Sequence, residues 1–364
     1  SLLQRLRPLY PQHQFVISVT TLTGYALARE RLAPEDVLLY FPFEWWHVMR
    51  RAVHAVRPQL ALIVETEIWP NFIYSLSRDR VPCLLVNGRI SAKSFRRYRR
   101  VKPFMRDVLG RFAQFNMQTA HDAERMRALG APADRVHITG NIKFDAARIT
   151  DVPAPDHALC DELGLPADTP VFLAAALDKS GCEDAMVLDV WERLRQACPA
   201  AALIIVPRHP ERGPDIARLV AARGYVPRRR SQGDRFTAPG TDVFILDTIG
   251  ELGRFYTLAR AAYVGKSMIP PGGGQNMIEP VALGVPTVYG PYTSNFRGVA
   301  DVLAEHGGAL IVRTPGALAD TLIALWNDPA RRAQLVARGQ AFIRGQQGAV
   351  QANVDTITAL LPLV

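Results

Sequence analysis

A glycine-rich segment in the second half of the chain, GGGQNMIEP from Gly272 to Pro280, carries the clearest chemical signal of the sequence. Glycine lets the backbone approach a ligand closely because it has no Cβ atom. A helix that begins near Asn276 would point free N–H groups and its positive dipole end toward a phosphate. Glu279, one turn inside that helix, could accept hydrogen bonds from two ribose hydroxyls. The segment therefore predicts a nucleotide-sugar site that includes Gly273 and Gly274.

Three further segments of this half follow apolar runs, so their polar residues should lie where strands end. In one of them Arg208 precedes His209, and the guanidinium fork of arginine matches the geometry of a phosphate or carboxylate. The other two lie where a phosphate and a sugar should sit. Their candidate donor-binding residues are Gly265, Lys266, Ser267 and Asn295.

Two segments of the first half also place ionisable residues after a strand. In ETEIW, which follows an apolar run, strand alternation would point Glu65 and Glu67 the same way. Two carboxylates beside a tryptophan can orient hydroxyls or hold a shifted pKa. Lys143 follows the last expected strand of this half and could reach an anionic donor.

The stretch from Ala92 to Lys102 places Phe95, Tyr98 and Val101 at helical spacing between arginines. Such a helix suits an anionic membrane surface, where each lysine or arginine contributes about 1 kcal/mol. A solvated basic face is the plainer interpretation and stays open. The basic residues expected to meet the membrane or acceptor are Lys93, Arg96, Arg97, Arg99 and Arg100.

Alternating strands and helices are needed to position these residues. Short, nearly continuous apolar runs suit parallel strands that are buried on both faces, which indicates an α/β fold with right-handed crossovers. Residues 228–234, which begin with three arginines, are expected to form an exposed loop. The expected strands lie at 15–19, 60–64, 83–86, 115–118, 171–174, 203–206, 243–246, 262–264 and 286–288.

A proline-rich segment at 150–156 is the expected linker. It divides the chain into an N-terminal domain of residues 1–150 and a C-terminal domain of residues 151–364, whose last helix could pack back on the N-terminal domain. Because parallel sheets bind ligands at the carboxyl ends of their strands, we expect the site in a cleft between two facing domains.

The net charge of +9 implies an anionic partner, which could be a nucleic acid, an anionic membrane or a phosphorylated substrate. The four cysteines are scattered without metal-ligand spacing, and no apolar run reaches the roughly 20 residues of a membrane span. No nucleic-acid-binding motif accompanies the charge. We therefore expect no nucleic acid partner and no metal site.

Taken in order, these segments resemble the Kdo transferase family, which moves 3-deoxy-D-manno-octulosonic acid (Kdo) from CMP-Kdo to the lipid A precursor. The resemblance implies a GT-B fold of two facing Rossmann-like domains, an inverting transfer without metal or cofactor, and a peripheral place on the cytoplasmic face of the inner membrane. The matching segments cover almost the whole chain and lie at 20–24, 65–71, 87–100, 140–145, 207–212, 247–252 and 272–280.

The resemblance also assigns roles to residues. The departing nucleotide needs cations to stabilise it, and the attacking lipid hydroxyl needs a base. The C-terminal domain would hold the CMP part of the donor. On the Kdo or acceptor side, the candidate catalytic residues are Glu65, Arg89 and Lys143. On the nucleotide side, the resemblance points to Arg208, Lys266, Asn276 and Glu279.

The base that the family uses is a Glu in a glycine-containing turn after the first strand, and we expect it upstream of Ser1, with the usual membrane anchor. On this expectation the chain as given binds the donor better than it catalyses transfer. Three alternatives stay open: another GT-B enzyme that uses a UDP-sugar, as a transferase or an epimerase; a donor-binding homologue that is inactive without the base; and a nucleic-acid binder.

Overall fold

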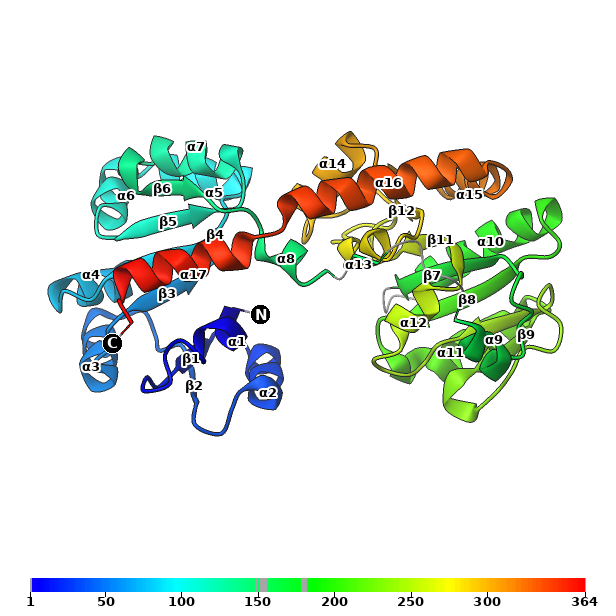
Figure 1. The fold of residues 1–364 in the computed structure, drawn as a ribbon, viewed down its shortest axis with the longest axis horizontal. Helices are drawn as coiled ribbons and strands as arrows, with labels where there is room; N and C mark the ends of the chain where they lie inside the picture. Colours follow the sequence, from blue (N-terminus) through cyan, green and yellow to red (C-terminus); the bar gives the residue numbers. More distant parts are fainter. Residues whose placement is uncertain (1, 148, 151–155, 178–181, 364) are drawn as a thin grey trace. The chain divides into compact units, whose positions relative to one another are not determined.

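The computed structural model describes residues 2–147, 149–150, 156–177 and 182–363. The chain divides into two compact units (Figure 1). Unit 1 contains Ser1–Ala146 and Gln346–Val364, and unit 2 contains Ala147–Gly345. The division falls just before the proline-rich segment that the sequence predicted as a linker, and residues 151–155 of that segment lie outside the described part of the chain.

Unit 1 consists of parallel strands that alternate with helices. Its strands are β1 (Val16–Val19), β2 (Val37–Tyr40), β3 (Ala61–Val64), β4 (Cys83–Gly88), β5 (Gln114–Met117) and β6 (Val136–Ile138). Its helices are α1 (Leu2–Leu6), α2 (Leu22–Arg31), α3 (Trp46–Val56), α4 (Pro70–Arg78), α5 (Ala92–Arg99), α6 (Lys102–Leu109), α7 (Ala120–Ala128), η1 (Ala133–Arg135), α8 (Ile142–Asp145) and α17 (Ala349–Leu360). Strands β3, β4, β5 and β6 form one sheet in that order, and β1 pairs with β2 in another.

The four-stranded sheet of unit 1 is buried on both faces, which explains the apolar runs of its strands. Alternate residues of β4 enter different cores, because side chains alternate across a strand. Leu85 packs with residues of α4, α6 and α7. Leu84 packs with residues of α17, the red helix that lies along this sheet in Figure 1. A buried hydrogen bond of 3.0 Å from Asn116 Nδ2 to Asn353 Oδ1 also ties β5 to α17.

Unit 2 contains a seven-stranded parallel sheet in the order β13-β12-β11-β7-β8-β10-β9. Its strands are β7 (Val171–Leu177), β8 (Ala202–Pro207), β9 (Val226–Arg229), β10 (Asp242–Ile245), β11 (Ala259–Val264), β12 (Thr287–Tyr289) and β13 (Leu310–Ile311). Its helices are α9 (His157–Leu163), α10 (Cys182–Ala197), η2 (Pro210–Arg212), α11 (Gly213–Ala222), η3 (Arg230–Gln232), α12 (Leu252–Tyr256), α13 (Ile278–Ala282), α14 (Arg297–Glu305), α15 (Pro315–Asn327) and α16 (Pro329–Gln346).

The sheet of unit 2 is also covered on both faces. In β7, Phe172 packs with α10 and α15 on one face, and Leu173 packs with α9 and α12 on the other. The strand order reverses beside β7, because the chain passes outward to β9 and β10 and then returns to place β11 next to β7. In parallel sheets this reversal opens a crevice at the carboxyl ends of the two strands, where ligands bind.

The nine strands expected from the sequence are confirmed within a few residues, and so is the parallel α/β fold. The exposed loop expected at 228–234 is wrong, because its first residues belong to the edge strand β9. There Arg228 pairs with the buried Asp242 at 3.2 Å, and Arg229 pairs with Asp247 at 2.8 Å. Buried carboxylates in β10 and just beyond its end thus allow arginines to occupy a strand.

Across the described residues, no helix is both long and apolar enough to span a membrane.

Candidate functional site

The carboxyl ends of β7 and β11, where the strand order reverses, approach each other closely. A Cβ atom added to Gly265 would lie 2.9 Å from the Ala176 carbonyl oxygen, so only glycine fits there. Ala176 and Lys266 adopt left-handed backbone angles, with φ of +58° and +57°. Non-glycine residues rarely take such angles, and the resulting strain concentrates at functional sites.

The glycine loop is built into this edge of the sheet. Gly272, Gly273 and Gly274 all have positive φ, of +60°, +129° and +72°, a run that residues with an L-configured Cα do not sustain. The Gly274 N–H donates to the Lys266 carbonyl at 2.7 Å, and the Asn295 N–H donates to the Gly273 carbonyl at 2.8 Å. The structure therefore brings the predicted residues that follow β11 and β12 together around the predicted loop.

The helix after this loop is shorter than the sequence suggested. It begins at Ile278 rather than at Asn276, and it has five residues. Asn276 Oδ1 accepts a hydrogen bond of 3.1 Å from the Ile278 N–H. One of the N–H groups expected to be free for a phosphate is therefore already satisfied by Asn276, whose side chain is otherwise exposed.

Glu279 lies in the first turn of α13 and is partly buried. Burial raises the pKa of its carboxyl group. The carboxylate lies beside Gly253 and close enough to Tyr256 to contribute, after burial, to the raised pKa of that phenol. No described residue donates a hydrogen bond to it. A half-buried carboxylate with this unused capacity can accept hydrogen bonds from ligand hydroxyls.

A buried carboxylate that the sequence did not identify holds the turn after β11. Glu183, at the start of α10, is 1% exposed. Its Oε2 atom accepts from the Lys266 N–H at 2.6 Å. Its Oε1 atom accepts from the N–H groups of Ser267 at 3.0 Å and Met268 at 3.2 Å and from the Tyr263 hydroxyl at 3.0 Å. Glu183 thus fixes three consecutive backbone N–H groups of the turn.

Ser267 is fully buried, so its place differs from the ligand contact that the sequence suggested. Its hydroxyl donates to the Val264 carbonyl at 2.6 Å and accepts from the Gly290 N–H at 2.8 Å. Its backbone N–H is held by Glu183. Its hydroxyl and backbone N–H are therefore both engaged within the protein, and Ser267 joins the turns after β11 and β12.

The turn after β8 holds two arginines in different environments. The Arg208 N–H donates to the Leu177 carbonyl at 3.1 Å, which fixes the turn beside the end of β7. The Arg208 side chain is exposed and makes no ion pair with another described residue. Arg212, in contrast, pairs with the buried Asp184 of α10. His209 faces Glu211 at 3.4 Å. Arg208 is thus the more available of the two arginines for an anion.

In unit 1, the ends of β3 and β4 carry two further left-handed residues, Glu65 with φ of +63° and Asn87 with φ of +53°. Glu65 pairs with Lys143 of α8 at 3.4 Å, and both side chains are about one-third exposed. Asn87 Oδ1 accepts from the Ile142 N–H at 3.1 Å and so holds the start of α8. The structure therefore brings together Glu65 and Lys143, two of the three residues predicted for the Kdo or acceptor side.

Two expectations for this edge need correction. Glu65 and Glu67 do not alternate along a strand, because β3 ends at Val64 and the left-handed turn begins at Glu65. Glu67 accepts from Trp69 Nε1 at 3.0 Å instead of facing Lys143. Arg89 lies just beyond β4 and is half-buried, and its guanidinium has no hydrogen-bond partner among the described residues.

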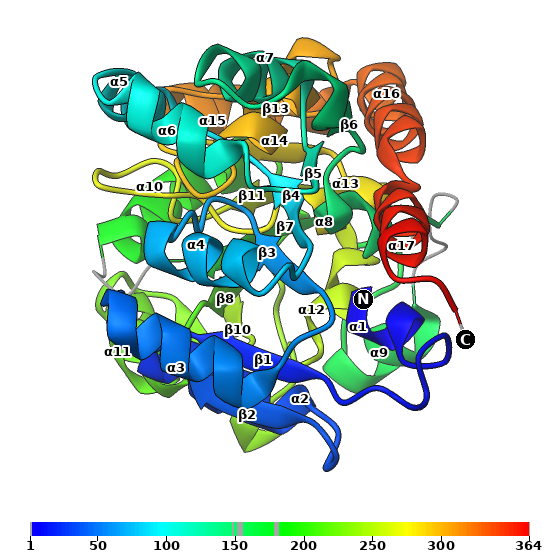
Figure 2. The same cartoon turned by 90° about the vertical axis from the view of Figure 1, so that its left-hand side faces the viewer.

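The basic helix also ends earlier than predicted. Helix α5 stops at Arg99, and α6 follows as a second helix with Val101 as its N-cap residue (Figure 2). Phe95 and Tyr98 pack against the core of unit 1, so they do not form an outer apolar stripe. Both side chains lie on the side of α5 that packs against the core, and Tyr98 also lines a groove. The five basic residues assigned to a membrane or acceptor, Lys93, Arg96, Arg97, Arg99 and Arg100, are all exposed.

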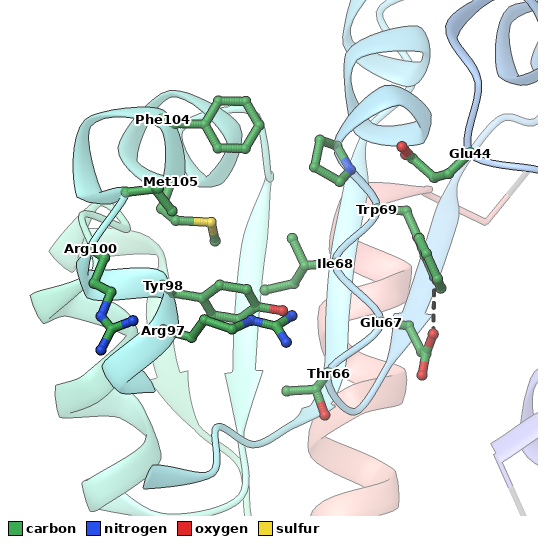
Figure 3. A pocket seen from close by; sticks show the side chains of 12 residues that line it. Glu44, Thr66, Glu67, Ile68, Trp69, Arg97, Tyr98, Arg100, Phe104 and Met105 are labelled. Carbon is green, nitrogen blue, oxygen red and sulfur yellow. Dashed lines mark hydrogen bonds between the residues drawn. The ribbon is translucent and has the colours of Figure 1, made fainter. Parts of the chain in front are cut away.

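A groove of about 680 Å³ lies between α5–α6 and the turn after β3. In Figure 3, Ile68 points into it from one side, and Tyr98 and Phe104 point into it from the other. Its further lining residues are Glu44, Thr66, Glu67, Trp69, Pro70, Arg97, Arg100, Val101 and Met105. Sequence patterns did not predict this groove, because its two walls are about 30 residues apart in the chain.

Sequence comparisons with known proteins point to one family. Residues 1–146 match the sequence model of a family described as 3-deoxy-D-manno-octulosonic-acid transferase (kdotransferase). The 3-deoxy-D-manno-octulosonic acid transferase of Bordetella pertussis is 32% identical over 339 residues, which are 92% of this chain and 76% of that protein. The enzyme of the same name from Haemophilus influenzae is 29% identical over 361 residues, 99% of this chain and 83% of its own.

The fold also resembles that of solved enzymes. A crystal structure of a glycosyltransferase from Rickettsia africae matches with a TM-score of 0.60 over 100% of this chain and 94% of that chain, at 10% identity. At so low an identity the likeness concerns the fold alone, which is of the GT-B type.

Proposed function

The chain belongs to the family of 3-deoxy-D-manno-octulosonic acid (Kdo) transferases, and we propose that it moves Kdo from CMP-Kdo to a lipid A precursor. It is thus a glycosyltransferase of lipopolysaccharide synthesis. In the transfer, a hydroxyl oxygen of the acceptor forms a bond to the anomeric carbon of Kdo. The bond from that carbon to the phosphate of CMP breaks, CMP leaves with the bonding electrons, and a base takes the hydroxyl proton.

The observation that carries the donor assignment is the arrangement around the glycine loop of unit 2. Lys266 and Asn295 are hydrogen-bonded through their backbones to the loop, and Glu279 follows it with a carboxylate that has no donor among the described residues. We assign Glu279 to the ribose hydroxyls of CMP. We assign Arg208 and Lys266 to its phosphate, where cations stabilise the charge that develops as CMP leaves.

The Kdo and acceptor side falls to unit 1 in this proposal. Glu65 and Lys143 form an ion pair at the strand ends, with each side chain about one-third exposed, and Arg89 lies just beyond β4. The cationic groups of Lys143 and Arg89 suit the carboxylate of Kdo. Glu65 holds Lys143 at 3.4 Å and therefore fixes where that positive charge lies.

Calorimetric titration of the chain with CMP, and with UMP and UDP for comparison, tests the donor assignment. We expect CMP to bind most tightly and the Glu279→Ala variant to bind it about 10- to 100-fold more weakly, because hydrogen bonds to a charged group contribute about 1.5–3 kcal/mol. Glu305→Ala, at an exposed residue of α14, is the matched control and should leave the affinity unchanged.

A preference for UDP over CMP would contradict the proposal and favour an enzyme that uses a UDP-sugar. Equal loss of affinity in the Glu305→Ala control would show that the Glu279 effect is not specific.

We further propose that the protein lies at the cytoplasmic face of the inner membrane and meets it through α5. The exposed Arg96, Arg97, Arg99 and Arg100 have no carboxylate partner among the described ion pairs, so their charge is available to anionic headgroups. Replacing all four with Ser should release the chain from vesicles that contain phosphatidylglycerol. Co-sedimentation measures this, and unchanged binding would remove α5 from the proposal.

A further inference from the structure

The loop between β2 and α3, together with the first residue of α3, exposes three large aromatic side chains in close succession. Phe43 is 80% exposed, Trp45 is 64% exposed and Trp46 is 44% exposed. We call these three residues the aromatic edge. Phe43 and Trp45 stack on each other with ring centroids 6.0 Å apart. Clustered exposure of this kind marks a surface that another molecule covers, because scattered single residues are the norm elsewhere.

The loop is held firmly, so the exposure is not that of a loose segment. The Glu44 carboxylate accepts from the Phe72 N–H at 3.1 Å and from Asn71 Nδ2 at 2.8 Å at the start of α4. Phe41 stacks on Trp69 with ring centroids 5.3 Å apart. Phe41 and Glu44 thus anchor the loop to the rest of unit 1, while the aromatic edge remains outside.

The surroundings of the aromatic edge combine apolar and positively charged groups. Glu44 also lines the groove of Figure 3, so the loop and the groove adjoin. The opposite wall of that groove carries Arg97 and Arg100, and Phe104 there is 47% exposed. Tryptophan and phenylalanine beside arginine are typical of surfaces that lie at the boundary between lipid headgroups and acyl chains.

We propose that the aromatic edge inserts into the interfacial layer of an anionic lipid bilayer, beside the arginines of α5. Long-range attraction then comes from α5, and the depth of binding comes from Phe43, Trp45 and Trp46. The combination of charge and aromatic rings favours a bilayer as the partner. Phospholipid phosphates complement the exposed arginines, and acyl chains complement the aromatic rings. The inference rests on the proposed function only for the presence of a membrane. It extends the membrane contact from α5 to the aromatic edge.

Tryptophan fluorescence tests the insertion directly. Of the five tryptophans, Trp191 and Trp326 are buried in unit 2, so changes on lipid binding report on unit 1. The chain is mixed with phosphatidylcholine vesicles that contain or lack phosphatidylglycerol, with bromine on the acyl chains as a quencher. We expect a blue-shifted emission and quenching by bromine near the headgroup end of the chains, with phosphatidylglycerol present.

Two variants separate insertion from charge. A double variant, Phe43→Ser with Trp45→Ser, should bind anionic vesicles about ten-fold more weakly and lose most of the bromine quenching. Its remaining binding should be abolished by salt, because only the arginines contribute to it. Ile249→Ser is the control, since Ile249 is 86% exposed but belongs to unit 2, and it should bind vesicles as the unchanged chain does.

Calorimetric CMP binding and thermal unfolding are both measured on each variant, and an unchanged unfolding transition shows that unit 1 is folded. Vesicle binding without bromine quenching would overturn the inference. A double variant that binds vesicles as tightly as the unchanged chain would also overturn it. Self-association that the double variant abolishes, without any vesicle binding, would instead identify an interface between copies of the chain. A failure of CMP binding would overturn the proposed function and leave the vesicle result to stand by itself.

Discussion

The two units differ in how carboxylates are placed at their strand ends. In unit 2, the Glu183 carboxylate is buried and accepts hydrogen bonds from consecutive backbone N–H groups. In unit 1, the accessible carboxylates of Glu65 and Glu67 face Lys143 and the Trp69 indole. Glu183 in unit 2 is 1% exposed. Glu65 in unit 1 is 35% exposed and meets Lys143 at 3.4 Å. Both edges nevertheless share left-handed residues directly at the ends of parallel strands.

This difference indicates two ways of preparing a binding surface. In unit 2, buried charges and glycines fix the backbone before any ligand arrives, which lowers the entropy lost on binding. In unit 1, charged and aromatic side chains remain at the surface and can adapt to a large amphiphilic partner. We therefore expect substitutions in unit 2 to affect stability and nucleotide affinity together, and substitutions in unit 1 to spare stability.

Replacing Glu183 should produce the largest effect. In Glu183→Gln, one oxygen is replaced by an amide N–H₂ that faces backbone donors, so buried N–H groups of the turn lose their acceptor. We expect the free energy of unfolding to fall by about 2–3 kcal/mol, measured by chemical denaturation, and CMP affinity to fall with it. Glu192→Gln, at an exposed position of the same helix, should change neither.

A Glu183→Gln variant with unchanged stability and unchanged CMP affinity would mean that the turn does not depend on its buried carboxylate. The contrast between the two units would then lose its physical basis.

A smaller effect, dependent on pH, is expected at Glu279. Because burial raises the pKa of its carboxyl group in the folded protein, the folded state binds the proton more readily than the unfolded state. Its contribution to stability is therefore full below the unfolded pKa of about 4.3 and falls as pH rises through the folded pKa. Glu279→Gln should be more stable than the unchanged protein at neutral pH, and this difference should vanish under acidic conditions.

Thermal unfolding followed across pH checks this sign. The opposite result, a variant that is less stable at neutral pH, would show that the Glu279 carboxylate has a stabilising partner in the folded protein.

The smallest effect on stability is expected at Lys143. Its ion pair with Glu65 is about one-third exposed on each side, and such pairs contribute about 0–1 kcal/mol. Lys143→Met should therefore change the free energy of unfolding by less than about 1 kcal/mol, while Kdo transfer from CMP-Kdo to a lipid A precursor falls about 100-fold. A large loss of stability with little loss of transfer would place Lys143 among the structural residues.

The sequence predicted the fold well because its signals are local. Apolar runs marked the strands, and the three glycines at 272–274 marked a backbone that other residues cannot follow. Parallel strands then require their polar ends to share one edge, so Gly265, Lys266 and Asn295 could be grouped without knowledge of the structure.

The parts that sequence reasoning missed depend on distant partners. Glu183 contacts Tyr263 and the following turn, some 80 residues along the chain. In the sequence alone, an acidic residue at the start of a helix indicates only a favourable interaction with the helix dipole. The packing of Phe95 and Tyr98 against the core depends on which side of α5 meets the core. For the aromatic edge a local signal did exist, since Phe43, Trp45 and Trp46 flank a carboxylate between a strand and a helix.

The docking of α17 on the sheet of unit 1 has a consequence for synthesis on the ribosome. One face of that sheet is covered by residues that follow Ala146 by about 200 positions. At a synthesis rate of about 5–20 residues per second, the last helix of unit 1 is made about 10–40 s after the rest of that unit. Unit 2 is one continuous stretch of the chain and can therefore fold first. During that interval the nascent unit 1 exposes Leu84, Val86 and the Asn116 Nδ2 group, which later donates to Asn353, to any protein that binds emerging chains.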